Sequence, residues 1–148
     1  MFSKSTEYAL RATIFIARNS SADTKVSIQS IAEGIGAPKP FIAKILQQLS
    51  NKQNQVISST PGPSGGFFIT KEKRSKPIYI VIEAMGDSTI IENCVLGLPN
   101  CSDAAPCSMH KVYKNIRKDL LSMFKDRTID EIAKSKDRLI PTDFSCKE

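Results

Sequence analysis

The chain has 148 residues, 41% of them hydrophobic, and a formal net charge of +6. This length suits one domain with a real core, and no apolar run reaches the roughly 18 residues that a membrane-spanning helix needs. The start of the sequence also lacks the continuous apolar stretch and the cleavage site of a signal peptide. We therefore expect a cytoplasmic protein whose thiols stay reduced.

The charge is unevenly distributed along the chain. Residues 1–80 contain eleven Lys and Arg against four Asp and Glu, whereas residues 81–148 contain ten against eleven. The amino-terminal part is therefore basic, and the remainder is close to neutral. This asymmetry indicates that the first part contacts a polyanion, although a solvated lysine-rich surface would give the same balance.

The first segments are predicted to be helical. Apolar residues recur with helical spacing between residues 3 and 18, and Ser5 or Thr6 is the predicted cap. Two shorter helices follow: Ser27 is the N-cap of the first, GIGAP ends it, and Pro40 lies in the opening turn of the second. Two helices joined by a tight, glycine-containing turn are typical of a helix-turn-helix. The predicted buried stripe of the second helix comprises Phe41, Ile42, Ile45, Leu46 and Leu49.

A β-hairpin is predicted directly after this motif. Val56–Ser59 and Phe67–Thr70 have the composition of strands and flank the loop TPGPSGG. A hairpin in this position is typical of the wing of a winged helix, and the basic segment KEKRSK that follows would lie near DNA phosphates. IVIEAMGD is predicted to form a short buried helix that ends at Gly86.

Three of the four cysteines and the only histidine lie in one segment rich in Gly, Pro and Asn. Six residues separate Cys94 from Cys101, five separate Cys101 from Cys107, and two separate Cys107 from His110. Such a loop can bring three sulfurs to one centre, and a helix that begins near Cys107 would carry His110 on the same face. An iron–sulfur cluster suits these ligands. A Cys3His zinc site, which usually has shorter spacings, and a thiol–disulfide switch are the alternatives.

A long amphipathic helix is predicted over residues 111–125. Its apolar stripe packs either within its own subunit or against the same stripe of a partner across a two-fold axis. A last short helix begins after Thr128, with Glu131 at the capping-box position. The tail RLIPTDFSCKE is expected to be irregular, and its Cys146 to play no part in the site. The stripe of the long helix comprises Val112, Ile116, Leu120 and Met123.

DNA is the expected polyanion. The second helix of a helix-turn-helix lies in the major groove. There lysine can bond phosphate oxygens or guanine, and glutamine can bond adenine. Hydroxyl groups on the wing can bond phosphates. The sequence contains no phosphate-binding loop, no nucleophile with a base and no second histidine, so we do not expect an enzyme. The candidate DNA-contact residues are Lys39, Lys44, Gln47, Gln48, Ser59, Thr60 and Ser64.

The order of these segments resembles the Rrf-two superfamily of bacterial winged-helix transcription regulators, and within it the members that sense through an iron–sulfur cluster. The resemblance covers about residues 2–134, through STEYALRA, SIQSIAEGIGAPKPFIAKILQQL, SSTPGPSGGFFIT, IVIEAMGD and the three cysteines. It implies a mainly α fold with a small β-hairpin. The implied organisation is a winged helix-turn-helix domain (residues 1–85), a cluster-binding loop (86–110) and a dimerisation helix with a C-terminal tail (111–148).

The resemblance also implies a homodimer that grips a palindromic DNA operator. In the family, three cysteines and a histidine at the position of His110 can complete a [2Fe–2S] site, which we prefer to a [4Fe–4S] site with the partner subunit's Glu7 as fourth ligand. Two departures are notable: Pro61 stands where the wing usually has arginine, and the first cysteine gap is one residue longer than usual. The predicted function is a regulator whose DNA affinity depends on a cluster that senses iron–sulfur, redox or nitric oxide status. The alternative is a zinc-stabilised or thiol-switched winged-helix regulator without a cluster.

Overall fold

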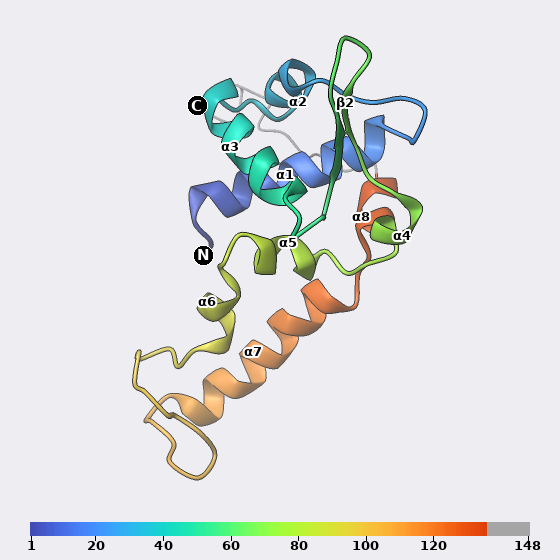
Figure 1. Ribbon diagram of the computed structural model, residues 1–148. Coiled ribbons are helices and arrows are strands. Elements are labelled where there is room, and N and C mark those ends of the chain that lie inside the picture. The colour runs from blue at the N-terminus through green and yellow to red at the C-terminus, as the bar shows by residue number, and fades with distance from the viewer. Residues whose placement is uncertain (136–148) are drawn as a thin grey trace, which may run out of the picture.

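The computed structural model describes residues 1–135 as a helical body from which an arm extends (Figure 1). The arm comprises residues 88–125, and the body comprises the preceding residues together with the last helix. One antiparallel hairpin is the only sheet among the described residues, so the predicted mainly α fold class is confirmed. The elements are α1 (Lys4–Asn19), α2 (Ile28–Ile35), α3 (Lys39–Ser50), β1 (Ser58–Thr60), β2 (Gly66–Phe68), α4 (Lys71–Arg74), α5 (Tyr79–Ala84), α6 (Ser88–Glu92), α7 (His110–Lys125) and α8 (Ile129–Lys134).

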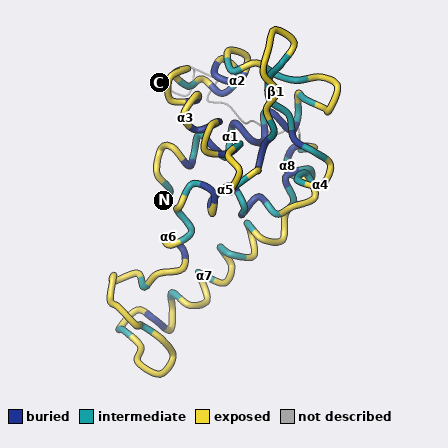
Figure 2. The backbone as a smooth tube through the Cα atoms, viewed as in Figure 1, coloured by how far each residue is buried: buried dark blue, intermediate teal, exposed yellow. Residues whose placement is uncertain are grey.

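The core surrounds α1, which packs against α2, α3, α5 and α8. Side chains such as Ile16, Ile31 and Leu46 are completely buried there, and removing this apolar surface from water is the main stabilising contribution to the fold. Burial is concentrated in the body, whereas the arm is mostly exposed or partly exposed (Figure 2). None of the helices described within residues 1–135 has the length and apolar content of a membrane span.

The amino terminus of α1 is capped by Ser3, so the prediction of Ser5 or Thr6 was wrong. The Ser3 hydroxyl accepts the backbone N–H of Thr6 at 3.2 Å. The predicted cap Thr6 is buried, and its hydroxyl donates to Asp87 at 2.6 Å. This bond from Thr6, together with those from Ser3, lowers the pKa of the Asp87 carboxyl. Asp87 thereby fastens the start of the arm to the start of α1, a long-range contact that local capping rules do not predict.

The predicted helix-turn-helix is confirmed, together with the residues that begin and end its helices. Ser27 caps α2 by accepting the N–H of Ser30 at 3.1 Å, and Gly36 ends α2 in the left-handed conformation with φ 64°. Pro40 lies in the first turn of α3, as predicted. Phe41 was wrongly predicted to be buried: its side chain is 58% exposed. The buried face of α3 begins at Ile42, and the preceding residue is rotated away by about 100°.

The hairpin forms the predicted wing, with Ser58 opposite Phe68 and Thr60 opposite Gly66. Its strands are shorter than predicted, since Val56 is buried in the core and donates its N–H to Leu49 at the end of α3. Gly66 has φ 150°, and a Cβ there would lie 2.6 Å from the carbonyl oxygen of Val26. Glycine is therefore needed where the wing approaches the chain before α2.

The first four residues of the segment KEKRSK form the short helix α4, and the arginine of this helix makes structural contacts. The Arg74 guanidinium donates to the carbonyl oxygens of Ala17 and Ser20 at 2.7 Å each and to that of Ile69 at 3.1 Å. Arg74 also lies 3.9 Å from the carboxylate of Asp130 in α8. The guanidinium thus joins the end of α1 to the region that follows the wing, where a basic DNA contact was predicted.

Replacing Arg74 by methionine is expected to destabilise the fold by about 2–3 kcal/mol, because charged hydrogen bonds are lost and partly buried carbonyl oxygens are left without partners. Urea unfolding measures this change. Lys71→Met on the same helix is the matched control, since Lys71 is exposed and its loss should change stability little. Equal unfolding midpoints for the two variants would contradict a structural role for Arg74.

The second half of the chain follows the prediction in part. α5 is a helix, as expected, and α8 has the predicted capping box between Thr128 and Glu131. The short helix α6 was missed, and α7 begins at His110 rather than one residue later. The predicted tail and Cys146 lie outside the described residues.

Candidate functional site

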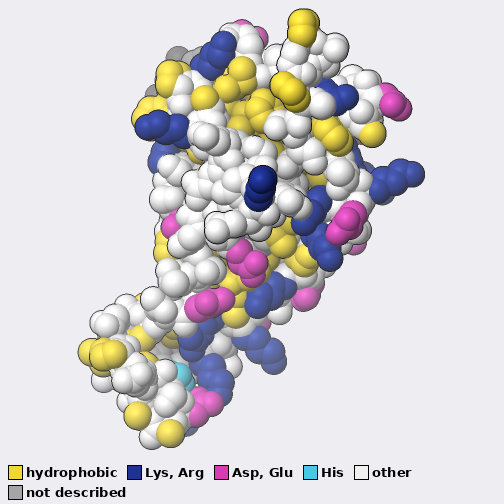
Figure 3. All heavy atoms as spheres, viewed as in Figure 1, with side chains coloured by type: hydrophobic (Ala, Val, Ile, Leu, Met, Phe, Trp, Pro, Cys, Tyr) yellow, Lys and Arg dark blue, Asp and Glu magenta, His cyan; other side chains and the backbone are white. Residues whose placement is uncertain are grey.

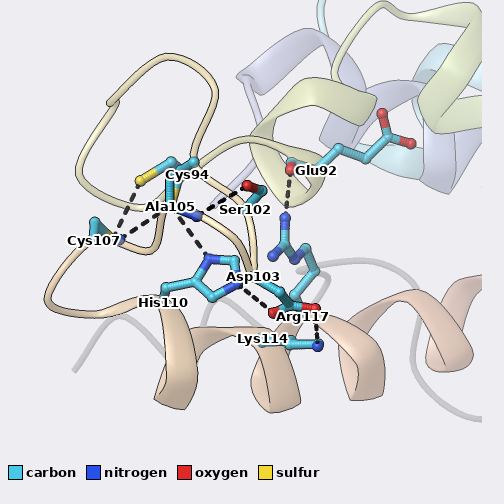
Figure 4. Close-up of polar contacts among 10 residues, drawn as sticks. Glu92, Cys94, Ser102, Asp103, Ala105, Cys107, His110, Lys114 and Arg117 are labelled. Atoms are coloured by element: carbon cyan, nitrogen blue, oxygen red, sulfur yellow. Dashed lines mark hydrogen bonds and ion pairs between the residues drawn. The ribbon is translucent and has the colours of Figure 1, made fainter.

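The three cysteines predicted to act together do converge at the far end of the arm. Their sulfur atoms all lie within 4.8 Å of one another. Cys94 and Cys107 are separated by 3.5 Å between sulfurs, and the Cys101 sulfur lies 3.2 Å from Nδ1 of His110. Figure 4 shows the His110 ring directed from the start of α7 toward this group. The chain therefore brings three sulfurs and one imidazole nitrogen to one place.

The cysteine loop, residues 93–109, achieves this convergence through tight turns. Gly97 and Asn100 both have positive φ, 71° and 57°, and the N–H of Gly97 donates to the carbonyl of Cys94 at 2.9 Å. The backbone N–H of Cys107 donates to the sulfur of Cys101 at 3.4 Å. Cys107 lies one turn before α7 and accepts the N–H of His110 at 3.2 Å. The loop is thus folded by its own backbone rather than by a hydrophobic core.

His110 is the one buried side chain of α7. Its Nε2 lies 2.9 Å from the carboxylate of Asp103, whose other oxygen accepts a hydrogen bond from Lys114 at 2.6 Å (Figure 4). Lys114 first and His110 second lower the pKa of Asp103. Asp103 was not among the predicted site residues. Its position two residues after a cysteine is the only signal in the sequence, and that signal is weak.

The thiols of the cluster differ in acidity. Backbone N–H groups, that of Leu98 foremost, lower the pKa of Cys94 to about 7, because they stabilise the thiolate. The N–H of Cys107 has the same effect on Cys101, yet partial burial and the two neighbouring thiols outweigh it and raise the pKa of Cys101. The thiolate is the form of cysteine that binds metals and attacks disulfides. The lowered pKa therefore makes Cys94 available as a thiolate, either for metal binding or for disulfide exchange.

The loop is attached to the body through Glu92, two residues before Cys94. The Glu92 backbone carbonyl accepts a hydrogen bond from Arg117 of α7 at 2.6 Å. The Glu92 carboxylate accepts one at 2.6 Å from the hydroxyl of Tyr79 in α5. Burial, with the negative charge of Glu92, raises the pKa of Tyr79 to about 12, so the phenol stays protonated. No motif in the sequence identifies these contacts, because they join segments far apart in the chain.

Glu7, the alternative fourth ligand, is not near the cysteines of its own chain. It lies in α1 of the body and forms an ion pair with Lys4 at 3.4 Å. The cysteine loop lies at the opposite end of the arm (Figure 1). Only a second copy of the chain could bring a glutamate at this position to the three sulfurs.

The candidate DNA-contact residues are all exposed. On α3, Lys44 and Gln47 occupy the face opposite the buried stripe, and Lys39 lies at its start. Gln48 differs from the others, because its amide donates to the carbonyl of Ala84 at the end of α5 at 2.8 Å. Gln48 therefore joins α3 to α5, and its contact with DNA stays a prediction. The wing hydroxyls of Ser59, Thr60 and Ser64 are exposed.

The apolar stripe of α7 is not covered by the rest of the described chain. Of the ten large hydrophobic side chains exposed within residues 1–135, eight lie between residues 90 and 123. Val112 is 61% exposed and Ile116 50%. Hydrophobic side chains are visible at the surface of the arm, near the histidine, in Figure 3. Of the two arrangements predicted for this stripe, packing within one subunit is therefore not observed among residues 1–135.

Comparisons with known proteins agree with this architecture. A family model described as Rrf2, iron-dependent transcriptional regulator, matches residues 2–135. An HTH-type transcriptional regulator of Aquifex aeolicus is 34% identical over 134 residues, covering 89% of this chain and 90% of the relative. The HTH-type transcriptional regulator IscR of Escherichia coli is 26% identical over 132 residues, covering 89% and 79%.

Solved structures show the same fold. CymR of B. subtilis, described as its global cysteine regulator, superposes with a TM-score of 0.74 at 18% identity, covering 93% of this chain and 98% of that one. IscR of T. potens superposes with a TM-score of 0.67 at 20% identity, covering 90% and 86%. The sequence relatives carry the names of transcriptional regulators, not enzymes, as was predicted for this chain. With a family match over almost its entire described length and a relative above 30% identity, the chain belongs to the Rrf2 family of transcription regulators.

Proposed function

We propose that this regulator binds a palindromic operator as a homodimer and that an iron–sulfur cluster at the cysteine loop modulates its affinity for DNA. The observation that carries the proposal is the convergence of three thiols and one imidazole at the end of an uncovered helix. Acting on bacterial DNA, such a protein would work in the cytoplasm.

The ligand set suits a [2Fe–2S] cluster in particular. The four ligand atoms form two close pairs, Cys94 with Cys107 at 3.5 Å and Cys101 with His110 at 3.2 Å. Two sulfurs bound about 2.3 Å from one tetrahedral metal lie about 3.8 Å apart, and a sulfur and a nitrogen lie about 3.5 Å apart, so each pair fits one metal ion. Mixed cysteine and histidine ligation is known for two-iron clusters. We infer that, with a cluster bound, Cys94 and Cys107 would hold one iron and Cys101 and His110 would hold the other.

When bound, the cluster would supply a centre that can be oxidised, nitrosylated or lost. Such a change would alter the positions that its four ligands take in the loop. The contacts of the chain provide a route from this loop to the DNA-contact helix. Glu92 is bonded to Tyr79 at the start of α5, and Ala84 at the end of α5 is bonded to Gln48 of α3. A shift of the loop would therefore act on α3 through one short helix.

The homodimer is supported by the exposed stripe of α7. Val112, Ile116 and Met123 line one face of this helix, and each is about half exposed or more. Burying such a face against its symmetry mate satisfies both copies at once, which is the usual geometry of a two-fold interface. Two DNA-binding units related by this axis would meet the two halves of a palindrome.

Lys44 is proposed to contact DNA from the exposed face of α3. Lys44→Gln is expected to weaken binding and to lower the slope of log affinity against log salt by about 1 per protomer, because each lost phosphate contact releases fewer counterions. Fluorescence anisotropy over a series of salt concentrations measures the slope. Lys118→Gln, which removes the same charge from the arm, should leave it unchanged. Equal slopes for both variants and the wild type would remove Lys44 from the interface.

A second candidate function follows from the distance between two thiols. The sulfurs of Cys94 and Cys107 lie 3.5 Å apart, so a small backbone shift would allow a disulfide. A structure of Staphylococcus aureus CymR, TM-score 0.66 at 18% identity, is described as an oxidized form. Regulation by thiol oxidation, or by zinc held by the same four residues, is therefore the alternative for this loop.

Elemental analysis separates these candidates. The protein is purified without oxygen, and iron, acid-labile sulfide and zinc are assayed on the sample that gives the visible spectrum. Iron and sulfide in equal amounts with broad visible absorbance support the cluster. Stoichiometric zinc without colour, or metal-free thiols even after anaerobic reconstitution, would overturn the cluster proposal in favour of the alternative.

A further inference from the structure

The carboxylate of Asp103, in the cysteine loop, contacts two side chains of α7. This carboxylate lies 2.9 Å from Nε2 of His110 and 2.6 Å from Nζ of Lys114. His110 and Lys114 lie four residues apart on α7, so they share one face of that helix. Asp103 therefore spans one turn of α7 and joins it to the middle of the loop, between Cys101 and Cys107 (Figure 4).

The chemistry of these groups determines the tautomer of the histidine. A neutral imidazole carries one N–H and one lone pair, and an ionised carboxylate can only accept hydrogen bonds. A neutral His110 that donates to Asp103 must therefore carry its hydrogen on Nε2. The lone pair is left on Nδ1, the atom that lies 3.2 Å from the sulfur of Cys101. Only a nitrogen with a lone pair can bind a metal ion.

We propose that Asp103 is a positioning residue for the metal centre: it holds His110 as the Nε2–H tautomer, with Nδ1 presented to the position that the sulfurs surround. This inference rests on the proposed role of His110 as a ligand. In this proposal Asp103 is the hydrogen-bond partner that fixes the orientation of the His110 ring, as carboxylates do in other histidine-ligated metal sites. This arrangement also favours His110 over Glu7 as fourth ligand, because the ring is already oriented within the same chain.

The single histidine of the sequence makes the test direct. Long-range proton–nitrogen NMR spectra of the reduced, metal-free, full-length chain at about pH 8, above the ordinary pKa of imidazole, report the tautomer from one pair of ring signals. The wild type should show Nε2–H, Asp103→Ala should shift toward a mixture with Nδ1–H, and Asp103→Glu should restore Nε2–H. Ser108→Ala, another exposed loop position, should match the wild type. A wild type with Nδ1–H, or a tautomer that Asp103→Ala leaves unchanged, would overturn the proposal.

Zinc affinity provides a second readout that needs no cluster. In competition with a chromophoric chelator, Asp103→Ala should bind Zn²⁺ roughly 10- to 100-fold more weakly than the wild type, with Ser108→Ala unchanged. Equal affinities would overturn the positioning role. The cluster proposal and the Asp103 proposal can fail separately. A protein that never acquires iron, but shows the effects of Asp103→Ala on the tautomer and on zinc affinity, refutes only the cluster proposal. A protein that loads a cluster while both effects are absent refutes only the role of Asp103.

Discussion

Replacing Cys107 by serine is expected to abolish cluster binding while leaving the winged body folded. Cys107 is one of the three sulfurs that lie within 4.8 Å of one another, and the loop holds it against Cys94 and Cys101. A hydroxyl is a poor substitute for a thiolate toward iron. Loss of a direct ligand should lower iron per protomer by at least about tenfold, because losing an outer partner alone costs 10- to 100-fold in affinity. Iron and sulfide assays with the visible spectrum measure the loss.

The body should be unaffected, since Cys107 lies on the arm and does not belong to the hydrophobic core of the described residues. Circular dichroism checks this, and Cys146→Ser is the control for removing a thiol elsewhere in the sequence. The same assay identifies the fourth ligand: His110→Ala should lose the cluster and Glu7→Ala should keep it. Retention of full iron and sulfide in Cys107→Ser would contradict the proposed ligand set.

Replacing Ile116 by aspartate is expected to convert the protein to a monomer and to weaken operator binding by about 100-fold or more. Ile116 lies in the middle of the uncovered stripe and is half exposed in one chain, so the substitution should not disturb the fold of a protomer. In a two-fold interface it would place two carboxylates in an apolar contact. Losing the second DNA-binding unit also forfeits the gain from simultaneous engagement of two half-sites.

Sedimentation equilibrium and fluorescence anisotropy with operator DNA measure these two effects. Asn115→Asp is the matched control: it adds the same charge one residue earlier, at a position that is exposed and rotated by about 100° around the helix. It should remain dimeric and bind DNA normally. A wild type that is monomeric at micromolar concentration, or a dimer that tolerates aspartate at position 116, would contradict the proposed interface.

The helix-turn-helix could be predicted from the sequence because its signals are local. Ser27, Gly36 and Pro40 act within one turn of the helix ends that they determine, so their effects need no knowledge of the rest of the fold. The cysteine spacing predicted convergence for a similar reason, since a loop with several turn residues leaves three thiols few other arrangements. The pairing of the thiols could not be predicted, because it depends on the conformation of that loop.

Contacts that the sequence did not predict arose where distant segments meet. The basic segment KEKRSK, which contains Arg74, was placed near DNA phosphates, because charge alone does not reveal the carbonyl oxygens of Ala17 and Ser20 that bind this arginine. The bond from Gln48 to α5 was not predicted, because it joins residues 36 positions apart. Asp103 was overlooked because no local pattern marks its contact with a ring seven residues away. In each case a tertiary contact, absent from any local pattern, determines what the side chain does.

The most direct test of the central claim compares the DNA affinity of one preparation with and without its cluster. A duplex is first selected from a random-sequence library with the loaded dimer and, separately, with the stripped dimer. Both forms are then titrated against both selected duplexes at the same salt concentration. The proposal predicts affinities that differ between the two forms by about 5- to 150-fold on at least one duplex, the usual range of coupling between two sites. Identical affinities of the loaded and stripped dimers for both duplexes would contradict it.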